Sequence, residues 1–106
     1  MVARSYSVDG YVIDPLMRDL VGHDRRPSSY LVYLALSASA AGSGSTSISL
    51  RELAEQTGLS KRRVHSAIQH LIERGLIEAN KKGATDVPRY RTLAPWRKDG
   101  GLPLML

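Results

Sequence analysis

Apolar residues recur at helical spacing in the middle of the chain, and signals for the start and end of a helix frame them. Leu53 and Thr57 fall on one helical face. Ahead of this face, Ser49 and Glu52 have the spacing of a capping box, in which each side chain bonds the backbone amide of the other residue. Gly58 follows the last periodic residue, at a position where a left-handed backbone favours glycine. The pattern predicts a short helix between Ser49 and Gly58.

A second apolar pattern predicts a longer helix directly after the first. Ser60 is the N-cap candidate for a helix that runs from Lys61 to about Arg74 and ends at Gly75. The apolar face expected for this helix consists of Val64, Ile68, Leu71 and Ile72, with Ala67 at its edge. Because only about two residues remain for the turn, the two helices form one tightly connected unit.

The segment after the second helix alternates apolar and polar residues on both sides of a turn-forming stretch. The alternation is clearest in Leu76–Glu78 and Tyr90–Thr92. Turn-forming residues between these flanks are Gly83, Asp86 and Pro88. The pattern predicts a β-hairpin in which Arg89 and Arg91 share one face of the return strand and Tyr90 points to the other.

The first half of the chain predicts two further helices that act as a scaffold. A short helix is expected to begin at Asp14–Pro15 and to end near Gly22. The next helix has Ser28 as its cap and runs to about Ala38, with apolar residues on two sides. Such a helix is either deeply buried or shared with a partner chain. Burial is the favoured interpretation, and a homodimer seam is the alternative.

The linking segments complete the expected organisation of the chain. Ala40–Ser47 is rich in glycine and serine and is expected to be a flexible link, after which Ile48 forms a short strand that pairs with the hairpin. Trp96 is expected to pack over the hairpin or the first helix. The expected parts are an N-terminal extension with a short helix (1–27), the main domain (28–93) and a C-terminal tail (94–106).

The second helix of the tightly connected unit combines a cationic start with a polar face. Cations at a helix N-terminus oppose the helix dipole, so phosphate binding would explain why three occur in succession. Arginine and glutamine on the polar face could contact guanine and adenine edges. The residues expected to contact DNA from this helix are Ser60, Lys61, Arg62, Arg63, His65, Ser66 and Gln69. The alternative is a solvated basic face on an ordinary pair of helices.

The hairpin carries a second group of cations. The residues expected to contact the DNA backbone or the minor groove are Lys81, Lys82, Arg89 and Arg91. The alternative is a hairpin that only covers the core, with lysines that keep its exposed edge soluble. Both interpretations can hold at once.

The net charge of +5 is distributed unevenly along the chain. Residues 51–98 hold 11 cations and 5 anions, whereas residues 1–50 hold 4 of each. This segregation favours encounter with a polyanion and a salt-dependent affinity. The sequence has no run of membrane-spanning length, no secretory signal at its start and no amphipathic helix typical of membrane binding. We therefore expect a cytoplasmic, nucleoid-associated protein that binds no membrane.

The residues with catalytic or metal-binding chemistry do not form a recognisable motif. Cysteine is absent, which excludes a disulfide framework and thiolate chemistry. His65 and His70 are five positions apart and share no helical face, and no cluster of acidic residues lies near either in sequence. A Ser–His–acid site could be assembled from the many serines, but no nucleophile-elbow pattern is present. We expect no enzyme activity, no metal site, no cofactor and no small-molecule ligand.

The central segment resembles the winged helix-turn-helix superfamily of DNA-binding domains. The matching stretches are LAEQTGLS (Leu53–Ser60), the apolar positions Val64, Ile68 and Leu71, and ERGLIE (Glu73–Glu78). Upstream, YVIDPLMRDL and SSYLVYLALSA (Ser28–Ala38) resemble the entry region of helix-turn-helix domains from phage and plasmid replication proteins. The resemblance implies an α+β, mostly α fold: a three-helix core, a β-hairpin wing and an N-terminal extension.

The resemblance also implies a function. Domains of this superfamily bind double-stranded DNA through the third helix and often recognise operators as dimers. We therefore expect a sequence-specific duplex DNA-binding protein that regulates transcription, with a homodimer as the form that the resemblance suggests. The alternative is a replication-initiation or replisome protein, in which the winged helix contacts origin DNA or a protein partner.

Overall fold

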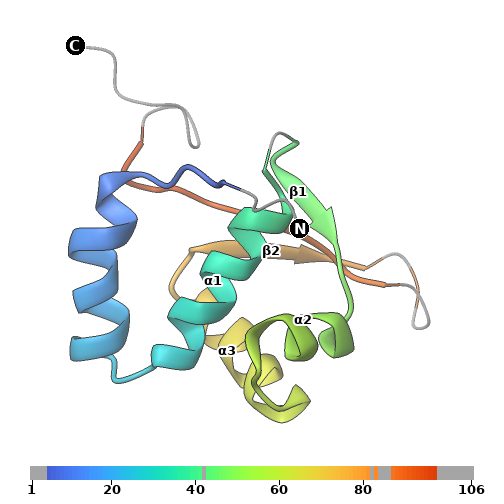
Figure 1. The fold of residues 1–106 in the computed structure, drawn as a ribbon. Helices are drawn as coiled ribbons and strands as arrows, with labels where there is room; N and C mark the ends of the chain where they lie inside the picture. The colour runs from blue at the N-terminus through green and yellow to red at the C-terminus, as the bar shows by residue number, and fades with distance from the viewer. Residues whose placement is uncertain (1–4, 42, 82, 84–86, 98–106) are drawn as a thin grey trace.

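The fold combines five helical elements with a small antiparallel sheet, and the first two of these elements form one continuous N-terminal helix over residues 10–23 (Figure 1). The computed structural model describes residues 5–41, 43–81, 83 and 87–97. The elements are η1 (Val12–Leu16), η2 (Arg18–His23), α1 (Pro27–Ser39), β1 (Ser45–Ser47), α2 (Leu50–Thr57), α3 (Lys61–Glu73), β2 (Ile77–Asn80) and β3 (Arg89–Thr92). Helices α1 to α3 with the β2–β3 hairpin confirm the expected α+β winged helix-turn-helix fold.

The helix-turn-helix unit forms from local contacts that the sequence predicted. The Ser49 hydroxyl accepts the Glu52 amide at 3.1 Å, and the Glu52 carboxylate accepts the Ser49 amide at 3.2 Å, which confirms the capping box of α2. Gly58 ends α2 in the left-handed region, with φ of 81°. The Ser60 hydroxyl then caps α3 by accepting the Arg63 amide at 3.1 Å.

The end of α3 sets the position of the hairpin. The Leu76 amide donates to the Leu71 carbonyl at 2.9 Å, and the Gly75 amide donates to the Ile72 carbonyl at 3.0 Å. This bond pair is the Schellman arrangement, and Gly75 supplies the left-handed residue that it needs, with φ of 71°. Leu76 therefore enters the core and β2 begins directly after the helix.

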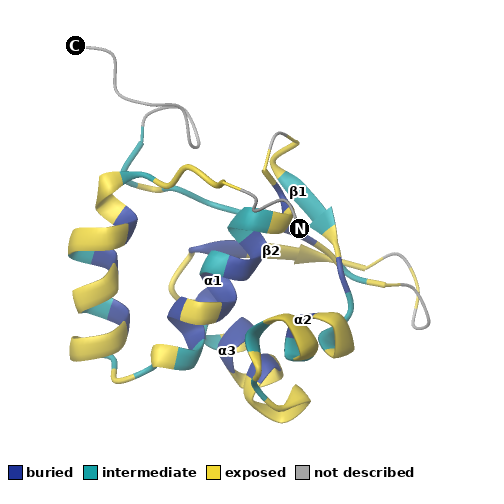
Figure 2. Ribbon diagram, in the orientation of Figure 1, coloured by how far each residue is buried: buried dark blue, intermediate teal, exposed yellow. Residues whose placement is uncertain are grey.

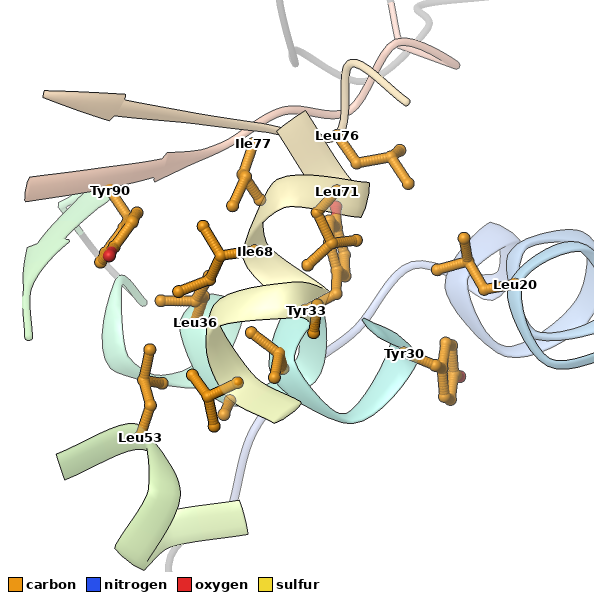
Figure 3. Packing of buried hydrophobic residues seen from close by; sticks show 14 of the residues in the cluster. Leu20, Tyr30, Tyr33, Leu36, Leu53, Ile68, Leu71, Leu76, Ile77 and Tyr90 are labelled. Carbon is orange, nitrogen blue, oxygen red and sulfur yellow. The ribbon is translucent and has the colours of Figure 1, made fainter. Parts of the chain in front are cut away.

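The buried face of α3 is rotated slightly from the expected one. The residues buried on this face are Val64, Ala67, Ile68 and Leu71. Ala67 lies within the face and not at its edge, whereas Ile72 was expected to be buried and is 39% exposed. The rotation follows from packing, because α3 lies chiefly against α1, and Leu36 of α1 belongs to the same buried cluster as Ile68 and Leu71 (Figure 3).

Helix α1 is buried on two sides, as expected, although it does not begin as expected. Its buried residues are Ser29, Tyr30, Val32, Tyr33, Ala35 and Leu36. Pro27 occupies the first turn and Arg26 is the N-cap, so Ser28 is not the cap. Proline suits this position because its missing N–H has no helical partner there in any case.

The N-terminal helix begins earlier than the sequence suggested. It starts at Gly10 and continues through Pro15, where the expected start had been placed. A proline ring clashes with the carbonyl four residues earlier, and the helix around Pro15 has the wider π-helical winding. With this winding, Val12, Leu16 and Leu20 point inward, whereas the apolar residues Met17 and Val21 remain exposed.

The N-terminal helix belongs to the same hydrophobic core as α1 to α3 (Figure 2). Leu20 is completely buried, and Figure 3 shows it on the side of the core where Tyr30 of α1 lies. The Tyr30 hydroxyl donates to the Val12 carbonyl at 2.9 Å. At the start of this helix, the ring of Trp96 stacks on the ring of Tyr11, with their centroids 4.5 Å apart.

The sheet has the order β1-β3-β2, so the return strand of the hairpin is central. Part of the expected flexible link forms β1, which pairs with β3 through Ser45↔Arg91 and Ser47↔Arg89. Ile48 lies just beyond the strand, buried in the core, and its amide donates to the Pro88 carbonyl at 3.3 Å. On β3, Tyr90 faces the core while Arg89 and Arg91 are exposed, which confirms the expected alternation.

Candidate nucleic-acid interface

Helix α3 presents a polar face to solvent along the side opposite its buried residues (Figure 2). The exposed members of the predicted set on this helix and its cap are Ser60, Lys61, Arg62, Arg63, His65, Ser66 and Gln69. Arg62 and Gln69 lie opposite the core, one behind the other along the helix axis. Within the described part of the chain, the side chains of Lys61, Arg62, His65 and Gln69 have no hydrogen bond or ion pair. They are therefore available to a ligand.

Ser66 differs from its neighbours because a residue from another element already bonds it. Nη2 of Arg26 donates to the Ser66 hydroxyl at 2.9 Å and to the Ser66 carbonyl at 3.1 Å. Arg26 precedes α1, so this contact joins the start of α1 to the middle of α3. We call the side of α3 that contacts residues of the first half of the chain the docked flank. Ser66 lies where this flank meets the exposed polar face of α3.

The docked flank continues to His70, which is partly buried. Nδ1 of His70 lies 2.8 Å from the Ser29 hydroxyl, and Nε2 lies 2.9 Å from Oδ2 of Asp24. An ionised carboxylate can only accept, so Nε2 donates to Asp24, and in neutral imidazole Nδ1 accepts from Ser29. The sequence has no cluster of acidic residues near His70, but the fold brings one acidic residue to it. Asp24 is 46 positions away, and only the tertiary fold brings it there.

Arg74 extends the flank by one more turn. It pairs with Asp19, and its Nε lies 3.6 Å from Oδ2 of Asp24. The pKa of Asp24 is lowered, first by a hydrogen bond from His23 and further by Arg74 and His70, while burial opposes the shift. Arg74 thus offsets part of the negative charge that two acidic residues of the N-terminal half bring to this flank.

Ser29, His70 and Asp24 have the residue types of a hydrolase triad, but they do not form a usable nucleophilic site. Ser29 is completely buried, with 0% exposure, so its hydroxyl cannot reach a substrate. The chain of bonds instead satisfies polar groups that folding removes from water.

Potential metal ligands occur at one place in the described part of the chain. Ligand atoms of Asp19, His23 and Asp24 lie within 4.8 Å of one another. Arg74 already pairs with Asp19, and His70 already bonds Asp24. These contacts within the protein explain why the three side chains lie close together.

The hairpin places its cations in two different settings. Arg91 pairs with Glu78 across β2 and β3, and Arg89 donates to the Ser47 hydroxyl at 3.0 Å. Lys81 is exposed at the end of β2, and its side chain contacts no charged group among the described residues. Lys82, also predicted to bind DNA, lies outside the described residues. In the described part of the hairpin, Arg89 and Lys81 are therefore cations without an acidic partner.

Two cations beside α3 were missed by reasoning from the sequence. Arg25 and Arg26 belong to the electrically neutral first half, yet they lie against the flank of Arg63 and Ser66. Their signal in the sequence is the adjacent pair directly before Pro27, at a helix start. A count of charge along the chain does not show them, because two anions of the same half, Asp19 and Asp24, cancel them in the count although they contact Arg74 and His70 instead.

Comparison with known proteins agrees with this architecture. Residues 26–77 match the model of a family described as a helix-turn-helix domain. The match begins at Arg26, spans α1, α2 and α3, and ends at the first residue of β2. No curated protein matches the chain in sequence. In the described ranges no helix has the length and apolar character needed to cross a membrane. Residues 26–77 of the chain thus form a helix-turn-helix domain of this family.

Proposed function

We propose that the protein binds specific sequences of double-stranded DNA and regulates transcription. In this proposal α3 is the recognition helix in the major groove, and the β2–β3 hairpin is a wing that contacts the phosphate backbone. Such a protein would act at the nucleoid, in the cytoplasm.

The observation that carries the proposal is the division of α3 into two faces. One face is buried against α1, and the other presents Arg62, His65 and Gln69 without partners among the described residues. An α-helix with its side chains is about 10–12 Å wide, and the major groove is about 12 Å wide. Arginine suits a bidentate contact to guanine, and glutamine suits a bidentate contact to adenine.

Phosphate contacts are proposed at both ends of this surface. Lys61 and the Ser60 hydroxyl lie at the start of α3, where free amides of the first turn also favour anions. Lys81, Lys82, Arg89 and Arg91 supply the wing. Because Arg91 pairs with Glu78, we propose that Lys81 and Arg89 contribute more to affinity than Arg91 does.

The salt dependence of binding tests the proposal. Duplexes are first selected from a random pool, and the affinity of the best duplex is then measured by fluorescence anisotropy at several salt concentrations. With about four to six phosphate contacts, log K against log salt should slope by about −4 to −5. A shuffled duplex of equal length should bind more weakly. A flat response, or no duplex binding at low salt, would contradict DNA binding and favour an acidic protein partner.

The role in transcription is separable from a role in replication initiation. Mapping of bound sites in the source genome should give sites that overlap promoters. Repeated sites clustered at a replication origin would instead support the initiation role.

We also propose that the protein binds as a homodimer. The selected site should then be palindromic, with half-sites about one helical turn apart. The mass of the complex in solution should correspond to two chains on one duplex. A single asymmetric site bound by one chain would contradict the dimer without affecting DNA binding.

A further inference from the structure

We propose that Arg25 and Arg63 together bind one phosphate of the DNA backbone, and that Arg26 holds their two elements in register. The inference rests on the proposed DNA binding and adds a contact from outside the helix-turn-helix unit and the wing. We call the site the arginine hollow. Its lining residues are Arg25, Arg26, Pro27, Ser28, Arg63, Ser66 and Ala67.

The arginine hollow is a surface depression between the segment before α1 and the first half of α3. Three guanidinium groups from these two elements line it, and no acidic residue does so in the described part of the chain. The side chains of Arg25 and Arg63 have no hydrogen bond or ion pair with any described residue. Guanidinium groups match the geometry of phosphate oxygens and bind them bidentately. The hollow therefore suits an oxyanion, and a backbone phosphate is the oxyanion that the proposed DNA binding would bring to it.

The nearest acidic residue in the sequence does not neutralise the hollow. Asp24 directly precedes Arg25, but both of its oxygens have other partners. Oδ1 lies 2.8 Å from Nδ1 of His23, and Oδ2 lies 2.9 Å from Nε2 of His70. The positive charge of Arg25 thus remains available to a ligand.

Arg26 acts as a positioning residue and not as the phosphate ligand. Its Nη2 donates to both the hydroxyl and the carbonyl of Ser66, which fixes the segment before α1 against α3. Arg63 lies one turn before Ser66 on the same flank of the helix. A phosphate in the hollow would therefore flank the bases that Arg62 and Gln69 contact.

The backbone of Arg25 offers an independent reason to assign it a role in binding. Its φ of 56° lies in the left-handed region, and Arg25 is the only described residue other than glycine with positive φ. Residues with a Cβ seldom adopt this conformation, and such outliers concentrate at functional positions. Glycine adopts the same conformation without strain. The substitution Arg25→Gly therefore removes the positive charge of the side chain and also relieves the strain of the backbone at this position.

The test compares wild-type protein, Arg25→Gly and the charge-matched control Arg18→Ala on the selected duplex. We expect Arg25→Gly to lower affinity for all duplexes by a similar factor and to reduce the salt slope by about 1. Its Tm should equal or exceed that of the wild type. Ethylation of single phosphates should identify one phosphate that matters to the wild type and to Arg18→Ala but not to Arg25→Gly. Arg63→Ala should lose sensitivity at the same phosphate.

Each outcome bears on the proposal separately from DNA binding itself. If Arg25→Gly keeps the wild-type slope and the wild-type pattern of ethylation sensitivity, the arginine hollow binds no phosphate, while α3 remains the recognition helix. If Arg18→Ala lowers the slope equally, the effect is one of net charge and the site is overturned. A lower Tm for Arg25→Gly would contradict the argument from backbone strain. Absence of duplex binding by the wild type would overturn the proposed function and the arginine hollow with it.

Discussion

The Ser29 hydroxyl lies 2.8 Å from Nδ1 of His70, although the two residues are 41 positions apart in the chain. Ser29 is on α1 and His70 is on α3, so the bond joins these two helices. Asp24 bonds the other ring nitrogen of His70 and completes a chain of three side chains. Because this chain is shielded from water, each member depends on the others for its hydrogen bonds.

Replacement of Ser29 by alanine should destabilise the protein. Ser29→Ala leaves Nδ1 of His70 without its partner, and an unsatisfied buried polar group costs about 1–3 kcal/mol. The free energy of unfolding, measured by urea titration, should fall by that amount. Ser28→Ala is the matched control at the neighbouring, partly exposed serine and should change stability by less than about 0.5 kcal/mol. Equal effects of the two substitutions would contradict the assignment.

The N-terminal helix should contribute to global stability and not behave as an independent extension. Leu20 is completely buried, so Leu20→Ala should lower the free energy of unfolding by about 2–5 kcal/mol. Val21→Ala changes the adjacent exposed position and should have a small effect. Thermal unfolding of both variants should remain a single transition. A separate early transition in Leu20→Ala would show that the helix unfolds independently of the core.

Acid should weaken the contact between the N-terminal helix and α3. The pKa of Asp24 is lowered from 3.8, which means that the native state favours the ionised carboxylate. The stabilisation that Asp24 provides is therefore present above pH 3.8 and is lost as the pH falls through its lower native pKa. NMR titration of the Asp24 carboxyl carbon should give a midpoint below 3.8. The stability difference between wild type and Asp24→Asn should shrink over the same range, and a midpoint above 3.8 would reverse the prediction.

Substitutions in the proposed recognition helix and in the proposed wing should affect DNA binding differently. Arg62→Ala or Gln69→Ala should reduce discrimination between the selected duplex and single-base variants by about 1–3 kcal/mol for each lost bidentate contact. Lys81→Ala should weaken all duplexes by a similar factor. Competition binding against a panel of single-base variants measures both effects. If the wing variant changed base preference and the helix variants did not, the proposed roles would be exchanged.

The helix-turn-helix unit was predictable because its signals act over a few residues. The bonds between Ser49 and Glu52 close within one turn, and those of Ser60, Gly58 and Gly75 are equally local. These contacts form in the same way whatever surrounds them. The boundaries of α2 and α3 therefore agree with the pattern of the chain.

The first half of the chain was harder to predict because its elements depend on distant partners. β1 forms from a serine-rich stretch with weak strand preference, and its partner residues on β3 lie 42 to 46 positions further along the chain. The N-terminal helix continues through Pro15 with its inner face packed on α1. In both places tertiary packing overrides local preference.

The sequence by itself determined the two helices of the turn unit, the wing and the cations at the start of α3, because periodicity, caps and turns are local properties. Only the tertiary structure decided which polar residues of α3 remain open. It engaged Ser66 and His70 with residues from the first half, and it left Arg62 and Gln69 exposed. It also brought Arg25 to the side of Arg63. These relationships join positions about 40 residues apart, and packing of α1 on α3 creates them where no periodicity could indicate them.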